Sequence, residues 1–305
     1  MFDMLTGKSF CSGTQMRLNI LLPKTVFVIL SAVVVFCTFA GAAAQDNQLT
    51  FIPGERLLFK LSWGFIPAGQ AVLEVLPIET VNGVKTYHFI MQARTNSFID
   101  KIYKYRARID AYADVNMTRS VMYRKETVTG RSAKKVQVLF DWEKNEALYH
   151  HVHTRPGQTP EISKQDKRTA LLPGTFDPLS VFYYTRLLTA GKSFSLAHPV
   201  TDGKDCVVAT ADIVERVKIR VNGTNYDTFL VQPDLKHLDG VFHKKKDAKI
   251  SIWVTADKRR IPVKIKSRVY VGSFTGELVA IEGPEDLVLN SPRAAEKGVA
   301  SPDGS

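Results

Sequence analysis

A two-residue alternation of apolar and polar side chains constrains the fold of this chain more than any other feature. It begins at Glu55 and continues, in short segments that stop at turn signals, through most of the sequence. Successive side chains of a strand point to opposite faces, so this period predicts half-buried β-strands. The segment "KYRARIDAYAD" (104–114) places Tyr105, Ala107, Ile109 and Ala111 on one face and Lys104, Arg106, Arg108 and Asp110 on the other.

The segment "KISIWVTADKRRIPVKIKSRVYVG" (249–272) repeats this alternation on both sides of a turn near Asp257. Asn-Gly pairs at 82–83 and 222–223 supply the positive φ angles that tight hairpins require. Strands do not alternate regularly with helices. We therefore predict a mainly β fold, a large curved antiparallel sheet or half-open β-barrel whose consecutive strands are joined by short hairpins.

The segment "FDPLSVFYYTR" (176–186) is the most helix-like part of the chain. Asp177 is a good N-cap and Pro178 suits the first helical position. Apolar residues follow at helical spacing, and such a stripe needs an apolar surface to cover. They are Leu179, Phe182, Tyr183 and Leu187. We predict one amphipathic helix at about 177–188, packed in the concave face of the sheet, with Asp177 as a structural cap rather than a catalytic acid.

The first 44 residues predict export. Arg17 and Lys24 precede an apolar run at 26–44, and Ala42 and Ala44 give a small-x-small pattern before Gln45. This is the pattern of a cleaved signal peptide. Translation from Met16 is an alternative start. An uncleaved anchor is the alternative to cleavage, because the apolar run is near the minimum length for a bilayer span.

The rest of the chain is interpreted as a single exported β domain at 45–289. The polar stretch at 153–176, rich in Pro and Gly, is interpreted as a long loop, and it is the place where two subdomains would divide. The segment 290–305 has the composition of a disordered tail.

The net charge of +11 points to an anionic partner. Cleavage after Ala44 removes Lys8, Arg17, Lys24 and Asp3, which leaves 38 basic and 29 acidic residues, or +9. Export excludes nucleic acid and leaves anionic lipid headgroups, lipopolysaccharide or acidic glycans, with a plainly solvated surface as the alternative. The candidate contact residues are Lys244, Lys245, Lys246, Lys249, Arg260, Lys264, Lys266 and Arg268.

No pattern in the chain predicts a catalytic, cofactor or metal site. Only Cys206 remains of the three cysteines after cleavage, so no intrachain disulfide forms, and we interpret Cys206 as a buried structural thiol. His151 and His153 share a strand face, and His88 or another distant residue would have to complete a zinc site. No carboxylate or thiolate stands at a recognisable ligand spacing, which favours surface or interstrand histidines.

Four motifs resemble those of a known family: "GERL" (54–57), "WGFIPAG" (63–69), "DPLS" (177–180), and "WVTAD" (253–257) followed by Pro262. With them the chain, from 53 to 283, resembles the bacterial domain-of-unknown-function family 3108. That resemblance implies an exported protein of the cell envelope, hence a periplasmic one. More remotely, a curved sheet with a helix in its concavity is similar to the lipoprotein carriers of the LolA and LolB type, an analogy of fold that does not fix function.

Three functional hypotheses follow. The first is a non-enzymatic carrier or binding protein for a lipid or acylated envelope component, with a cavity lined by Trp63, Phe65, Phe182, Tyr183 and Trp253. The alternative is a structural or interaction protein of envelope assembly that uses a basic surface. The last is a hydrolase of an envelope polymer, which would need Asp177, His151 or Glu74 to converge in a cleft. The partners expected are a lipid, a lipoprotein or an anionic envelope surface, with at most peripheral membrane contact.

Overall fold

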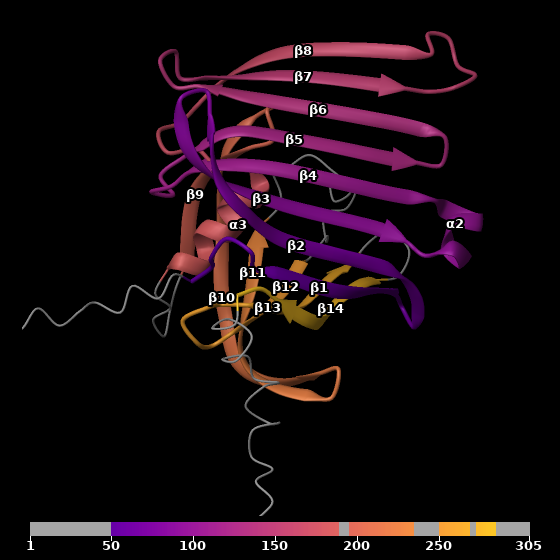
Figure 1. Cartoon of the computed structure of the whole chain (residues 1–305), viewed down its shortest axis with the longest axis vertical. Coiled ribbons are helices and arrows are strands. Elements are labelled where there is room, and N and C mark those ends of the chain that lie inside the picture. Colours follow the sequence, from indigo (N-terminus) through magenta and orange to yellow (C-terminus); the bar gives the residue numbers. More distant parts are fainter. Residues whose placement is uncertain (1–49, 189–194, 235–249, 269–272, 285–305) are drawn as a thin grey trace, which may run out of the picture. The chain divides into compact units, whose positions relative to one another are not determined.

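The computed structural model describes residues 50–188, 195–234, 250–268 and 273–284. In these residues the chain forms one 14-stranded sheet and two helices (Figure 1). The helices are α2 (Ser97–Tyr103) and α3 (Pro178–Leu187). The strands are β1 (Arg56–Trp63), β2 (Ile66–Val81), β3 (Val84–Thr95), β4 (Tyr105–Asp114), β5 (Ser120–Thr129), β6 (Ser132–Asp141), β7 (Glu146–Thr154), β8 (Ile162–Ala170), β9 (Ser195–Thr201), β10 (Cys206–Val221), β11 (Thr224–Asp234), β12 (Ile250–Thr255), β13 (Pro262–Arg268) and β14 (Ser273–Glu282).

Strands that are neighbours in sequence pair antiparallel, except β8 and β9, and the first strand also pairs antiparallel with the last. The order is β8-β7-β6-β5-β4-β3-β2-β1-β14-β13-β12-β11-β10-β9. Strand β1 pairs with β14 from Arg56 opposite Glu282 to Trp63 opposite Phe274. The order ends at β8 and β9, so the sheet is open. The predicted antiparallel β fold is thus confirmed.

Tight hairpins join the strands where the sequence predicts them. Asn82 and Gly83 have φ angles of 49° and 78°, and Asn222 and Gly223 have 47° and 86°. Both central residues of each turn therefore adopt the positive φ that Asn-Gly turns favour.

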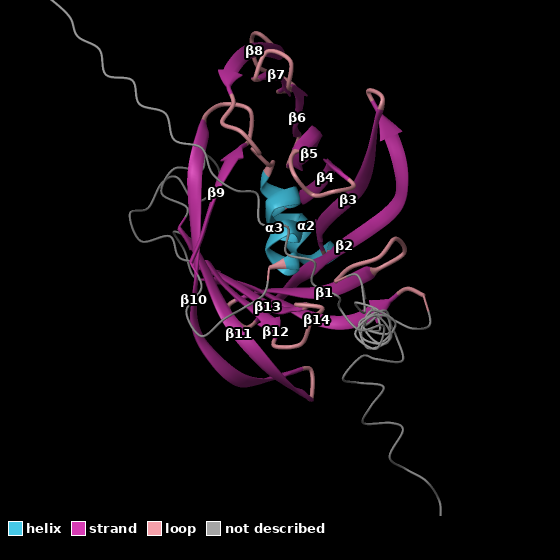
Figure 2. Cartoon of the chain, turned by 90° about the vertical axis from the view of Figure 1, so that its left-hand side faces the viewer, coloured by secondary structure: helices cyan, strands magenta, loops and turns pink. Residues whose placement is uncertain are grey.

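The sheet curves around α3, which lies within its concave face (Figure 2). Tyr183 of α3 stacks on Phe89 of β3, with ring centroids 4.0 Å apart, and Phe51 meets Tyr183 edge-on at 5.3 Å. The predicted helix and its packing are confirmed. Leu187, expected to face the strands, is instead 39% exposed. The last turn buries Arg186 in place of Leu187, because Arg186 reaches an ion-pair partner inside the fold.

Two elements differ from the sequence expectation. The stretch 153–176, expected to be a loop, contains strand β8, whose residues "ISKQDKRTA" are polar on both faces. Such an edge strand is held by its backbone pairing with β7 and carries no apolar alternation. The second helix, α2, was not expected; it begins at a cap in which Asn96 accepts a hydrogen bond from the Ile99 N–H at 2.9 Å.

Three predictions lie outside the described residues: the signal peptide at 1–44, the tail at 290–305 and the lysines Lys244, Lys245, Lys246 and Lys249. Among the residues that are described, no helix combines the length and apolarity of a membrane span.

Candidate functional site

A buried ion pair fixes the C-terminal turn of α3. The Arg186 guanidinium binds the Glu55 carboxylate at 2.5 Å (Nη1–Oε1) and 2.9 Å (Nη2–Oε2), and both side chains are 1% exposed. Its remaining donors reach the carbonyls of Arg259 and Thr50 at 3.1 Å. Burial alone would lower the pKa of Arg186, but the Glu55 carboxylate outweighs it and raises that pKa. The "GERL" motif and the final residue of the helix segment thus meet in one contact.

A second buried carboxylate fixes the N-terminus of α3. Asp177 Oδ1 accepts from the N–H groups of Leu179 and Ser180 at 2.9 Å, and Oδ2 accepts from the Ser120 hydroxyl at 2.6 Å. The Asp177 N–H donates back to Ser120 Oγ at 2.8 Å. Burial raises the pKa of Asp177, although these hydrogen bonds oppose the rise. Asp177 occupies the N-cap, where every contact is structural.

An apolar cavity of about 220 Å³ lies between α3 and strands β9 to β12. Small side chains at Ala209 and Ala211 of β10 leave the space open beside the helix. The lining is mostly aliphatic and aromatic, and includes Val181, Phe182, Leu196, Val231 and Ile252. With its ends fixed by Asp177 and Arg186, α3 forms a rigid wall of this cavity.

Arg260 brings a cation to the apolar cavity. Its guanidinium carbon lies 5.1 Å from the centroid of the Phe229 ring, and its Nη1 donates to the Ala256 carbonyl at 3.3 Å. Burial lowers the pKa of Arg260, an effect that Asp257 opposes from a distance. No carboxylate among the described residues forms an ion pair with it, while Asp234 also lines the cavity.

One of the five residues predicted to line a cavity lines this one. Phe182 faces it, whereas Tyr183 is fully buried in the core and Trp253 packs against that core from β12. Trp63 is 36% exposed and Phe65 is fully exposed at the β1–β2 hairpin, so neither belongs to the cavity. Their aromatic character predicts an apolar contact but does not distinguish an inner from an outer surface.

The histidines do not come together. The rings of His151 and His153 lie 6.1 Å apart on β7, and burial, together with neighbouring positive charges, lowers the pKa of both. His88 lies elsewhere, between Glu79 at 2.6 Å and Asp110 at 3.0 Å. The described part of the chain contains no cluster of three or more His, Cys, Asp or Glu residues arranged for a metal ion.

The three groups that a hydrolase would require are also separate. Asp177 is enclosed at the α3 cap, Glu74 lies 3.7 Å from the Arg56 Nε, and His151 packs beside Tyr149. Cys206 is half-buried, with its Sγ 3.3 Å from the Thr175 hydroxyl.

The predicted basic surface is divided. Lys264 lies on β13 and is paired with Glu277 at 3.0 Å, and Lys266 on the same strand is exposed. Arg260 lies at the cavity instead of on this strand face. The position of Arg268 in β13 is described, but its side chain is not.

No pattern in the sequence predicts the ion pair or the position of Arg260. Glu55 and Arg186 are 131 residues apart, one in the "GERL" motif and the other at the end of the helix segment 176–186. Their shared burial could have been suspected only from a charged residue within each otherwise apolar segment.

Fold and cavity together define a class: an open, barrel-like antiparallel sheet wrapped around one capped helix, with an apolar cavity beside that helix. Within that class the chain belongs to the family described as "Protein of unknown function (DUF3108)", which it matches over residues 58–279. It is also similar to a crystal structure of a beta-barrel-like protein of domain of unknown function DUF1849 from Brucella abortus, with 13% sequence identity and a TM-score of 0.46. That similarity covers 76% of this chain and 98% of the other. No curated protein matches the chain significantly.

Proposed function

We propose that this protein is a non-enzymatic binding or carrier protein for a single acyl chain, presented by a lipid or an acylated envelope component. The observation that supports this proposal is the apolar cavity between α3 and β9 to β12. An unfilled apolar cavity forfeits the dispersion contacts that a packed interior makes. An apolar ligand in the cavity would restore those contacts. The buried Asp177 and Arg186 hold both ends of α3, so the helix would keep its place as one wall of the binding site.

The cavity volume limits the guest. At about 220 Å³ it exceeds the roughly 150 Å³ of an engineered cavity that admits benzene. It is below the ~300–1,000 Å³ of pockets that enclose drug-sized ligands. One chain or one ring fits this space, and a whole diacyl lipid does not.

Arg260 suggests the chemistry of the ligand's polar end. A half-buried guanidinium with no described carboxylate partner favours an anion, because charge-assisted hydrogen bonds strengthen away from water. A chain that ends in a carboxylate or phosphate would satisfy the apolar lining and the cation together. Asp234 in the same lining would oppose a second negative charge.

The proposed location is the periplasm, after cleavage of the signal peptide. The predicted signal and the envelope setting implied by the family resemblance support it, and the partners proposed are lipids, lipoproteins or an anionic envelope surface. Sequencing the N-terminus of the exported protein tests this directly. Gln45 as the first residue supports cleavage, whereas a retained apolar run supports the anchored form.

Displacement of an apolar fluorescent probe tests the binding function. Wild-type protein should enhance the emission of a naphthylamine probe, and a medium-chain fatty acid should displace it. Ala211→Trp should abolish both effects by filling the cavity. Val208→Trp is the matched control, since Val208 is on the same strand but 51% exposed, and it should behave as wild type.

The Arg260→Gln variant tests the ligand's charge. It should lower the affinity for the fatty acid about tenfold and leave the affinity for its methyl ester unchanged, because only the acid offers a carboxylate to the guanidinium. Equal probe binding by wild type and Ala211→Trp would contradict the proposed function. If the variant bound the acid and the ester equally more weakly, Arg260 would not recognise the carboxylate, and the proposed binding function itself would stand.

A further inference from the structure

Large apolar side chains are exposed together at one end of the central strands β1 to β4. Three belong to the β1–β2 hairpin and three to α2, which connects β3 to β4. Phe65 is fully exposed, Ile102 is 75% exposed and Phe98 is 61% exposed. We call this set the aromatic edge: Trp63, Phe65, Ile66, Phe98, Ile102 and Tyr103.

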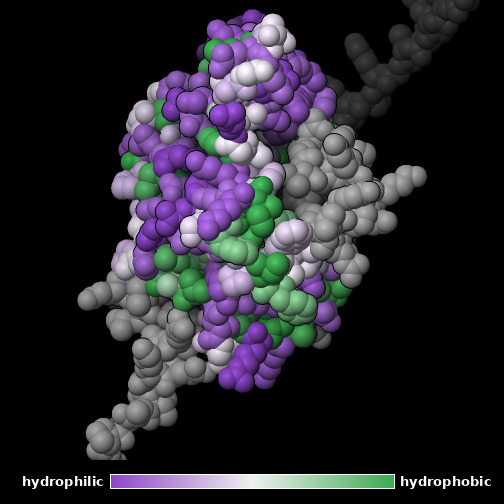
Figure 3. Space-filling view, turned by 90° about the vertical axis from the view of Figure 1, so that its right-hand side faces the viewer, coloured by the Kyte–Doolittle hydropathy of each residue, from purple (hydrophilic) through white to green (hydrophobic). Residues whose placement is uncertain are grey.

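Backbone contacts hold the two parts of the aromatic edge side by side. Asn96 lies at the start of α2, and its side-chain amide donates to the Pro67 carbonyl at 2.6 Å. The backbone N–H of Asn96 donates to the Ala68 carbonyl at 2.9 Å. Trp63 stacks on Phe274 of β14 with centroids 6.3 Å apart, which extends the patch across β1. Seen from this side, apolar surface gathers in a patch bordered by hydrophilic residues (Figure 3).

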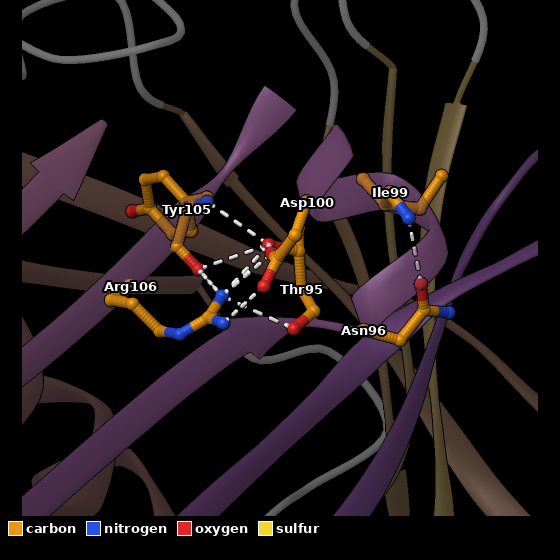
Figure 4. Close-up of polar contacts among 6 residues, drawn as sticks. All are labelled: Thr95, Asn96, Ile99, Asp100, Tyr105 and Arg106. Carbon is orange, nitrogen blue, oxygen red and sulfur yellow. Dashed lines mark hydrogen bonds and ion pairs between the residues drawn. The ribbon is translucent and has the colours of Figure 1, made fainter. Parts of the chain in front are cut away.

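The helix α2 presents its apolar side chains outward. Only Ile99 is buried, while Phe98 and Ile102, four residues apart on the helix, are exposed. The arrangement is rigid: the Asp100 carboxylate binds the Arg106 guanidinium of β4, and Thr95 joins the same network (Figure 4). These contacts hold the exposed apolar face in place.

The charge beside the aromatic edge is positive. Lys101, Lys104 and Arg131 are exposed, and a hydrogen bond from the Gly130 N–H to the Lys104 carbonyl at 2.9 Å places the β5–β6 turn next to α2. The one carboxylate of α2, Asp100, is already paired with Arg106, whose hydrogen bond lowers the pKa of Asp100 to about 2. The cations are therefore available to an external anion.

We propose that the aromatic edge docks this protein on the surface of an anionic lipid bilayer. Aromatic and aliphatic side chains enter the boundary between headgroups and acyl chains, and the flanking lysines and arginine contact lipid phosphates. Each such cation near an anionic bilayer adds to the attraction. The edge involves none of the cavity residues, so this proposal does not depend on the proposed binding function.

The shape and composition favour a bilayer over a protein partner. Phe65 is fully exposed at the tip of a two-residue hairpin, and the contacts of Asn96 with Pro67 and Ala68 place the start of α2 beside that hairpin. Protruding aromatic residues flanked by cations insert readily into a fluid interface. A protein partner would need a complementary pocket and a compensating acidic surface.

Vesicle flotation tests the proposal. The full chain should float with phosphatidylcholine vesicles that contain phosphatidylglycerol, more weakly as salt increases. The triple variant Phe65→Ser/Phe98→Ser/Ile102→Ser should bind at least about tenfold more weakly, because it loses most of the insertable surface. The N-terminal apolar run is present in both proteins, so their difference reports the edge alone.

A matched variant controls for general loss of apolar surface. Ile78, Ile162 and Val214 are 47%, 54% and 54% exposed elsewhere on the sheet, and their joint change to Ser should leave vesicle binding unchanged. Lys101→Glu/Lys104→Glu should remove the preference for phosphatidylglycerol. Wild-type binding by the Phe65 triple variant overturns the proposal. So does self-association through the edge without vesicle binding, which would identify a second copy as the occupant.

Discussion

Arg186 is the largest fully buried side chain in the described part of the chain, and Glu55 supplies the charge that balances it. A buried pair of this kind adds little compared with an apolar pair of the same shape. Breaking it is costly, because the remaining charge is left without a partner or water. Its role here is to fix where the last turn of α3 meets the start of β1.

Replacing one member of the pair should therefore be far worse than replacing both. Glu55→Gln should lower the free energy of unfolding by about 3–5 kcal/mol, measured by urea denaturation. Glu55→Leu/Arg186→Met should recover most of that loss. Glu282→Gln, which breaks the exposed 2.5 Å pair with Arg56, is the control and should cost within about 1 kcal/mol. If Glu55→Gln and Glu282→Gln lowered the free energy of unfolding by similar amounts, the special role of the buried pair would be refuted.

Asp110 gives a prediction for acid stability. Burial would raise its pKa, but hydrogen bonds from His88 and Arg108 dominate and lower that pKa to about 2. A carboxylate whose pKa is depressed by folding stabilises the protein above its unfolded pKa of about 3.9 and loses that contribution as the pH falls toward 2. The stability difference between wild type and Asp110→Asn should shrink between pH ~4 and pH ~2. A difference that stays constant over this range would contradict the assignment.

At the residue scale, the sequence predicts those roles that depend on residues nearby in the chain. The Asp-Pro pair predicts the cap of α3, because an N-cap bonds to N–H groups two and three residues ahead. Glu55 and Arg186 gave no such signal, since their contact exists only once the sheet has formed. Phe65 shows the same limit: its aromatic ring predicted burial, and only the hairpin geometry places it outside.

At the scale of elements, Gly69 of β2 shows why the "WGFIPAG" motif ends in glycine. A Cβ at this position would lie 2.0 Å from the Arg94 carbonyl oxygen of β3, closer than any side chain can approach backbone. The β2–β3 pairing at Gly69 and Thr95 therefore requires a residue without a Cβ. The pairing ends at Thr95, and the next residue, Asn96, is the N-cap of α2.

Gly69→Ala should weaken that pairing. We expect a loss of about 1–3 kcal/mol in urea denaturation, because backbone must move to relieve the clash. Gly276→Ala is the control: it is also in a strand, and its Cβ would meet only a Leu61 methyl group at 3.3 Å. Equal effects would show that the carbonyl contact is not what selects glycine.

Strands with one buried face were predictable, and elements without an apolar period were not. The alternation in β4 and in β12–β13 shows directly because one face of each packs inward. Strand β8 lacks that signal because both its faces are polar. Helix α2 spans 7 residues, too short for a period, and turns its apolar residues outward.

At the scale of the whole molecule, the pairing of β1 with β14 joins the two ends of the sheet-forming chain. Arg56 and Glu282 are 226 residues apart, yet their side chains meet at 2.5 Å. The family match begins in β1 and ends in β14, so it includes the part of this pairing from Phe59 opposite Leu278 to Trp63 opposite Phe274. Hairpin signals predict neighbours in sequence, and no local pattern predicts a pair so distant.

Two truncations should distinguish the contribution of the sheet to stability from that of the C-terminal tail. Ending the chain after residue 289 removes only the segment predicted to be disordered and should leave the unfolding midpoint unchanged. Ending it after residue 272 removes β14, which deprives β1 of one of its two partners and takes Leu278 from the core. That protein should lose cooperative unfolding in calorimetry. A cooperative transition in the shorter chain would contradict the role of the β1–β14 pairing.

The central claim is that a single acyl chain occupies the cavity beside α3, and photo-crosslinking tests it most directly. A fatty acid with a diazirine along its chain would be irradiated with the protein and the modified peptides mapped by mass spectrometry. We predict modification of α3 and of β10 to β12, at residues such as Phe182, Ala211 and Ile252, and its loss in Ala211→Trp. Modification confined to the aromatic edge or to the apolar run at 26–44, or unchanged by Ala211→Trp, would contradict the claim.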